Sequence, residues 1–145
     1  MKTVLQRVLK ADVIIEDKIH SSIDQGLLVL LGIQKSDTIK DIGYLAKKIV
    51  KLRIFNDNKN KMNLSAMDLN VSIMLISQFT LYGQCNKGNR PSFINVASQE
   101  KARPLYETVI QLLKKSNINV ESGKFGARMN VKLNNDGPVT LILES

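Results

Sequence analysis

The chain has 145 residues, of which 43% are hydrophobic, and its 21 Lys and Arg against 13 Asp and Glu give a formal net charge of +8. These values indicate one folded domain, residues 1–145, and exclude a disordered chain, while the positive charge favours a polyanionic partner. The single Cys85 excludes an internal disulfide, and no apolar run is long enough to cross a bilayer. We therefore expect a cytoplasmic protein without membrane contact.

Short β-branched stretches alternate with turns in the first third of the chain. The sequence predicts three short strands there: Thr3–Leu9, Asp12–Glu16 after a connection at Lys10-Ala11, and Ile19–Ile23 before a turn at Asp24-Gln25-Gly26. Leu27–Ile33 is apolar throughout, which predicts a central strand buried on both faces.

Two segments have the apolar spacing of amphipathic helices. The first follows Asp37, a predicted N-cap, and repeats apolar side chains at Ile39, Ile42, Leu45, Ala46 and Ile49. The second covers about Arg103–Lys115, and Pro104 fits its first turn better than its interior.

Further strands are predicted at Arg53–Phe55, Val71–Ser77, Met129–Leu133 and Val139–Leu143, and Gly83–Ser92 is a basic loop. About seven strands and two main helices indicate an α/β fold, a single compact domain with a mixed or antiparallel, barrel-like β-sheet.

The inventory of reactive side chains is short. One histidine, His20, and one cysteine exclude a tetrahedral Cys/His zinc site within the chain, and no glycine-rich phosphate-binding motif is present. His20 lies in a predicted strand, away from any obvious nucleophile. An enzyme of this sequence is expected to work without a metal or a cofactor.

Two polar stretches remain as candidates for a site. Ser77-Gln78-Phe79-Thr80-Leu81-Tyr82 ends an apolar strand, where sheet proteins often place ligand groups, and Asp136-Gly137-Pro138 precedes the last strand. Each also has an ordinary interpretation, as a polar strand end and as a turn. The residues alone leave both interpretations open.

At these stretches the chain resembles a known family, the D-aminoacyl-tRNA deacylases. The matching segments run nearly end to end: Gln6-Arg7-Val8, Gly26–Gly32, Lys61-Met62-Asn63, Ser77–Tyr82, Arg90-Pro91-Ser92-Phe93, Phe125-Gly126-Ala127 and Asn135–Thr140. The resemblance implies a homodimer that hydrolyses the ester of D-aminoacyl-tRNA, and of glycyl-tRNA mischarged on tRNA(Ala), and releases the free D-amino acid.

The resemblance also implies roles for particular residues. The Gly137–Pro138 peptide would be cis and would enter the active site of the opposite subunit, where its carbonyls reject an L side chain, and Arg7 would support it. Ser77, Gln78, Phe79 and Thr80 would form the facing catalytic wall, with backbone amides that capture the substrate. Phe125 and Met129 would pack the terminal adenine of the tRNA.

Several alternatives stay open at this point. Thr80 is a candidate nucleophile, but no base is apparent beside it, which favours activation of water by the 2′-hydroxyl of the tRNA. A non-catalytic RNA-binding module would also suit the positive charge, and a small-molecule hydrolase would use Thr80 or Cys85. Asn89 and Arg128 depart from the family pattern, so the surface that docks the tRNA body is not defined.

Overall fold

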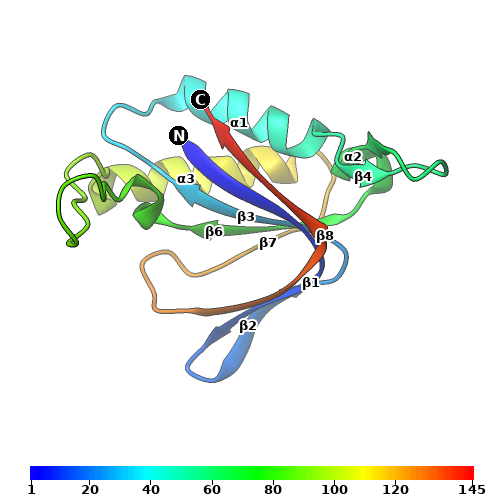
Figure 1. Cartoon of the computed structure of the whole chain (residues 1–145), viewed down its shortest axis with the longest axis horizontal. Helices are drawn as coiled ribbons and strands as arrows, with labels where there is room; N and C mark the ends of the chain where they lie inside the picture. Colours follow the sequence, from blue (N-terminus) through cyan, green and yellow to red (C-terminus); the bar gives the residue numbers. More distant parts are fainter.

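The computed structural model describes residues 1–145 as a curved, mixed β-sheet with its long helices on one face (Figure 1). The strands are β1 (Lys2–Ile15), β2 (Lys18–Ile23), β3 (Gly26–Gly32), β4 (Phe55–Asn56), β5 (Met62–Leu64), β6 (Ser72–Ser77), β7 (Val120–Ser122) and β8 (Asn130–Glu144). The helices are α1 (Ile39–Lys51), α2 (Ala66–Leu69) and α3 (Gln99–Lys114), and η1 (Phe79–Tyr82) is a 3₁₀ turn. None of these helices has the length and apolar character needed to cross a membrane.

The long strand β1 is the centre of the sheet. Along one edge it pairs antiparallel with β8, and along the other edge it pairs with β3 in its first half and with β2 in its second half. The sheet continues from β3 through β6 to β7 by parallel pairing. Ser21 of β2 donates a hydrogen bond to the carbonyl of Ser122 in β7 at 3.0 Å, so the sheet curls into a nearly closed barrel.

The predicted α/β class with a barrel-like sheet is confirmed, and α1 and α3 are the two main helices, with the one-turn α2 as a third. The prediction of two separate strands before Lys18 is wrong, because β1 is continuous. Its register against β8 passes from Val8↔Asn135 to Lys10↔Asn134, so a β-bulge lies at Leu9, and the predicted connection Lys10-Ala11 is itself paired in the ladder. The two strands predicted after Arg128 are likewise one interrupted strand, β8.

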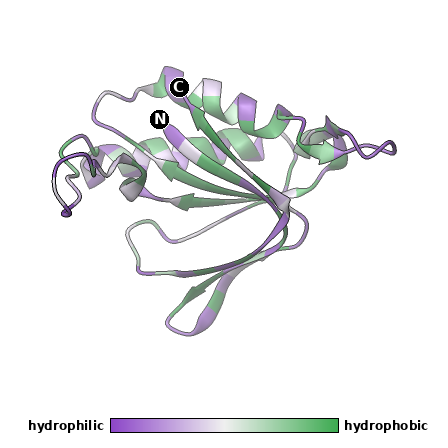
Figure 2. Cartoon of the chain, in the orientation of Figure 1, coloured by the Kyte–Doolittle hydropathy of each residue, from purple (hydrophilic) through white to green (hydrophobic).

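Each face of the sheet covers its own apolar core. Leu5, Leu27 and Leu75 face α1 and α3 in the larger core, while Val8, Leu28 and Met74 fill the inside of the barrel. In Figure 2 the hydrophobic colour follows the sheet and the inward sides of the helices. The prediction that Leu27–Ile33 is buried on both faces is confirmed, because side chains of β3 alternate between the two cores.

The starts of both long helices differ from the prediction. Thr38, not Asp37, is the N-cap of α1, and the hydrogen bonds that the Thr38 hydroxyl and amide donate to Asp41 lower the pKa of that carboxyl to about 2. Asp37 is buried and binds the α-amino group of Met1 at 2.7 Å. Helix α3 begins at Gln99, so Pro104 lies inside it rather than in its first turn.

The tight pairing of β3 with β6 yields a stability prediction. A Cβ on Gly26 would lie 2.0 Å from the carbonyl oxygen of Ser72, whereas a Cβ on Gly43 in α1 would meet nothing within 4 Å. Gly26→Ala should lower the free energy of unfolding by about 2 kcal/mol or more, and the control Gly43→Ala should raise it by up to about 1 kcal/mol. Urea denaturation measures both, and equal effects would contradict this account of the sheet.

Candidate active site

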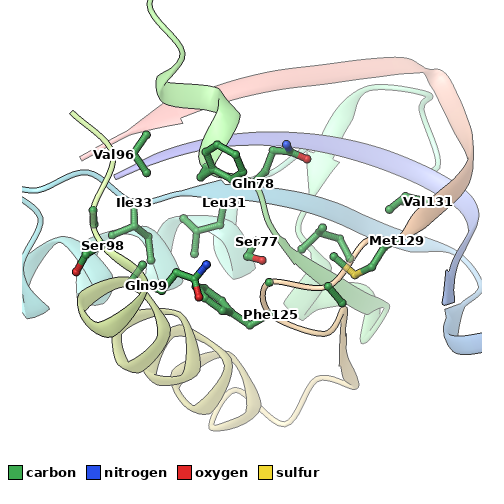
Figure 3. Close-up of a pocket in the computed structure, with 16 residues that line it drawn as sticks. Leu31, Ile33, Ser77, Gln78, Val96, Ser98, Gln99, Phe125, Met129 and Val131 are labelled. Atoms are coloured by element: carbon green, nitrogen blue, oxygen red, sulfur yellow. The ribbon is translucent and has the colours of Figure 1, made fainter. Parts of the chain in front are cut away.

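A cavity of about 510 Å³ lies at the carboxyl ends of the parallel strands β3 and β6 (Figure 3). Its walls come from the ends of β3 and β6, from the start of α3, and from the segment that leads into β8. The lining residues are Leu31, Ile33, Ile76, Ser77, Gln78, Phe79, Val96, Ala97, Ser98, Gln99, Ala102, Phe125, Gly126, Ala127, Met129 and Val131. The carboxyl ends of parallel strands are where α/β proteins bind ligands.

The polar wall of the cavity begins where β6 ends. Gln78 donates its backbone N–H to the carbonyl of Leu31 at 2.7 Å, so this amide is already occupied. The backbone N–H groups of Phe79 and Thr80, which open η1, have no acceptor within the chain. Phe79 lines the cavity and Thr80 follows it in the chain, so these free amides are candidate donors to an oxygen that gains negative charge.

Thr80 is exposed and does not line the cavity. Its hydroxyl accepts a hydrogen bond from the side-chain amide of Gln78. An amide nitrogen donates and cannot take up a proton, and no histidine, carboxylate or amine contacts the hydroxyl. The surroundings of Thr80 therefore do not activate it as a nucleophile.

The aromatic wall is formed by Phe125, which packs against the ring of Tyr106 with the two centroids 5.6 Å apart. Tyr106 donates its hydroxyl hydrogen to the carbonyl of Leu75 at 2.7 Å, and burial raises the pKa of this phenol well above its usual value. The side chain of Met129 packs against the backbone of Gly123, because a Cβ on Gly123 would lie only 2.6 Å from the Met129 sulfur. Phe125 and Met129 thus lie in the same cavity as Ser77 and Gln78 (Figure 3).

The Gly137–Pro138 corner lies elsewhere in the chain. The register of β8 against β1 passes from Thr140↔Gln6 to Asn135↔Val8, so the intervening residues leave the ladder as a wide bulge opposite Arg7. The Gly137–Pro138 peptide is cis, and both residues are exposed. Neither residue lines the cavity, nor does Arg7.

Arg7 packs directly behind this corner and is 6% exposed. Its guanidinium donates to the carbonyl of Ile54 at 2.6 Å, and its Nε lies 2.9 Å from a carboxylate oxygen of Asp136, an ion pair without the alignment of a hydrogen bond. Gly137 has φ of +116°, and a Cβ there would lie 3.0 Å from Arg7 Nη2. The corner is therefore exposed on its outer side and closely packed on its inner side.

The remaining sequence candidates lie away from the cavity. His20 is exposed on β2, and Cys85 is exposed, with the carbonyl of Gly83 at 4.0 Å as its one polar contact. Asn89 and Arg128 are exposed as well. Nowhere in the chain do three His, Cys, Asp or Glu side chains gather as potential metal ligands.

The wall that the start of α3 contributes was not predicted from the sequence. Ser98, the N-cap, and Gln99 and Ala102 in the first turns line the cavity. Placing Pro104 in the first turn moved the predicted helix start past these residues. The signal that could have found them was Ser98 followed by Gln99 and Glu100, which is a typical helix start.

The position of Ala102 gives a direct test of the cavity. Because Ala102 lines it and is 9% exposed, the indole of Ala102→Trp should occupy the space and, if the cavity holds the adenine that the family resemblance implies, abolish adenosine binding while the chain stays folded. Glu107→Trp, on the exposed side of the same helix, is the matched control and should bind as the wild type does. Calorimetric titration with adenosine compares the two, and full binding by Ala102→Trp would show that the ligand lies elsewhere.

Known proteins are similar to this chain over nearly its whole length. Residues 4–144 match the family described as D-Tyr-tRNA(Tyr) deacylase. A protein named D-aminoacyl-tRNA deacylase from Clostridium botulinum (strain Alaska E43 / Type E3) is 54% identical over 145 residues, which cover all of this chain and 97% of the relative. One of the same name from Thermosipho melanesiensis is 55% identical over 146 residues, with the same coverage.

Two solved structures share the fold. One, named c-Myc DNA Unwinding Element Binding Protein, superposes with a TM-score of 0.93 at 42% identity and covers all of this chain and 99% of its own. The other, a probable eukaryotic D-amino acid tRNA deacylase, has a TM-score of 0.86 at 16% identity and covers 99% of this chain and 98% of its own. The second likeness shows the fold alone.

The fold is that of a small α/β protein with a cavity at the carboxyl ends of its parallel strands. The chain belongs to the D-aminoacyl-tRNA deacylase family, and it is a hydrolase.

Proposed function

We propose that this protein hydrolyses the ester between a D-amino acid and the 3′-terminal adenosine of tRNA, and releases the free D-amino acid in the cytoplasm. The observation that carries the proposal is the match to the curated deacylases over the whole chain, at 54% identity. The net charge of +8 suits a tRNA substrate. Glycyl-tRNA mischarged on tRNA(Ala) is a second proposed substrate, because glycine has no side chain to reject.

The cavity is proposed to hold the terminal adenosine. Phe125 offers an aromatic ring at one wall and Met129 a polarizable thioether at another, and both suit a flat base. The ester would then lie toward Ser77 and Gln78 at the other wall, next to the free amides of Phe79 and Thr80. This arrangement needs no contact with the amino acid side chain.

Stereochemical selection is proposed to come from the Gly137–Pro138 corner of a second copy of the chain. The corner is exposed, backed by buried Arg7, and absent from the lining of its own cavity. In a homodimer it would project its backbone carbonyls into the partner's cavity. Rigid backbone can exclude an L side chain by steric conflict while admitting the hydrogen that a D-amino acid places there.

For the chemical step we propose that the tRNA's own 2′-hydroxyl helps activate the attacking water. The amides of Phe79 and Thr80 would stabilise the oxyanion, and losing one such donor typically costs about a hundredfold or more in rate. Gln78 would hold the Thr80 hydroxyl through the hydrogen bond that it donates. Thr80 would then keep the catalytic wall in place and would not attack the ester. No step in this scheme requires a general base from the chain.

The filter predicts a change in chiral discrimination. The wild type should deacylate D-Tyr-tRNA and spare L-Tyr-tRNA. Gly137→Ala should reduce the ratio of the two rates by about tenfold or more, since its Cβ would lie 2.9 Å from Val139 and 3.0 Å from Arg7 at a positive φ.

Gly88→Ala is the control for this experiment, because Gly88 also has a positive φ, +69°, but nothing within 4 Å. Initial rates with the two charged tRNAs measure the ratio. Undiminished rejection of the L-ester by Gly137→Ala would contradict the filter. Salt-dependent tRNA binding without turnover by the wild type would instead indicate a non-catalytic RNA-binding module.

The role of Thr80 is tested by removing its hydroxyl. Thr80→Ala should stay within about tenfold of the wild-type rate, whereas loss of a nucleophile costs roughly a thousandfold or more. Thr80→Ser keeps the hydroxyl and serves as the comparison. An inactive Thr80→Ala with an active Thr80→Ser, or a covalent adduct on Thr80 or Cys85 in the mass spectrum, would favour a nucleophilic mechanism.

A further inference from the structure

Arg103 lies at the rim of the cavity, on helix α3. Gln99, four residues earlier, and Ala102, its immediate neighbour, both line the cavity, so Arg103 is on the adjoining face of the same turns. Its guanidinium carbon is 5.2 Å from the centroid of the Phe125 ring, a cation–π contact with the aromatic wall. This contact places a positive charge at the cavity edge, beyond the ring on which a base would stack.

The charge on Arg103 has no partner in the chain. The ion pairs join Met1 to Asp37, Lys2 to Glu144, Arg7 to Asp136 and Lys10 to Asp12, and Arg103 donates no hydrogen bond to any side chain or carbonyl. Glu107, one turn further along α3, is not within ion-pair distance. Arg103 is exposed, its N–H donors have no acceptor in the chain, and its guanidinium contacts the Phe125 ring.

The geometry of these free donors favours a phosphate as the ligand. The guanidinium of Arg103 contacts the Phe125 ring through its positive charge, and a guanidinium carries five N–H donors in a rigid plane. Two parallel N–H groups pair with two oxygens of a phosphate better than with any single carbonyl. Lys124, exposed and next to Phe125 in the chain, adds to the positive field on the same side and has no ion-pair partner either.

We propose that Arg103 binds the phosphodiester that joins the terminal adenosine of the tRNA to the preceding nucleotide. The proposal rests on the proposed function, because it assumes an adenine stacked at Phe125. This phosphate is separated from the adenine by one ribose. It lies on the side where the tRNA strand must leave the cavity. Arg103 is thus a binding residue for the tRNA strand, distinct from the groups that contact the ester.

The test compares two D-tyrosyl esters that differ in this phosphate, D-Tyr-tRNA and 3′-D-tyrosyl-adenosine without a 5′-phosphate. Arg103→Gln should raise KM for D-Tyr-tRNA about tenfold and leave kcat unchanged. The slope of log kcat/KM against log salt concentration should become shallower by about 0.7. The reaction with the phosphate-free ester should be unchanged, and Arg103→Lys should restore part of the loss.

Lys114→Gln is the matched control, because Lys114 is exposed on the same helix about 16 Å further along its axis. It should behave as the wild type does. An equal loss of kcat/KM on both esters in Arg103→Gln would overturn the proposal, because Arg103 would then act only through Phe125. An unchanged kcat/KM on both esters would overturn it as well. Failure of the wild type to cleave either ester would overturn the proposed function itself, and is seen before any variant is compared.

Discussion

The buried guanidinium of Arg7 is the constraint on which the proposed stereochemical filter depends. A side chain that is 6% exposed and charged must find partners, and Arg7 finds them in two segments: the carbonyl of Ile54 and the side chain of Asn56 in one, and the carboxylate of Asp136 in the other. These contacts tie the bulge of β8 and the start of β4 to the centre of β1. Leaving a buried donor of this guanidinium without its partner typically costs about 1–3 kcal/mol.

Hydrogen bonds within β8 also hold the Gly137–Pro138 corner in place. Asn135 accepts the backbone N–H of Val139 at 2.9 Å and donates to the hydroxyl of Thr140 at 3.0 Å, so the bulge is closed on itself as well as on Arg7. A corner held in this way cannot yield easily to a substrate. Rigidity on the inner side and exposure on the outer side are what a steric filter supplied to another chain would require.

Several elements were predictable from the sequence because one physical signal dominates each of them. The unbroken apolar run of β3 reflects burial on two faces, and the helical spacing of Ile42, Leu45 and Ile49 reflects the single buried face of α1. The long strands β1 and β8 were divided in the prediction because a bulge shifts the alternation of side chains without ending the strand. Asp37 was misassigned because its role, binding the α-amino group of Met1, depends on a contact far away in the sequence.

Some residues of the candidate site could likewise be predicted from the sequence, and others could not. The polar strand end predicts Ser77 and Gln78, the resemblance adds Phe125 and Met129, and the structure brings all four to one cavity. Ala102 carries no chemical signal in a sequence, since its small size matters only once its neighbours are known. The separation of the Gly137–Pro138 corner from that cavity is likewise a property of the fold and not of any local pattern.

The central claim, that each cavity is completed by the corner of another copy, is tested by the chiral discrimination of mixed dimers. Gly137→Ala chains are combined with an excess of Ala102→Trp chains, which keep an intact corner but have a filled cavity. Almost every Gly137→Ala chain, which has the open cavity, is then paired with an Ala102→Trp chain. In a two-fold dimer the intact corner of that partner enters the open cavity. We predict that the ratio of D- to L-Tyr-tRNA deacylation rises to the wild-type value. A ratio that stays at the value of Gly137→Ala alone, whatever the excess, would contradict the claim.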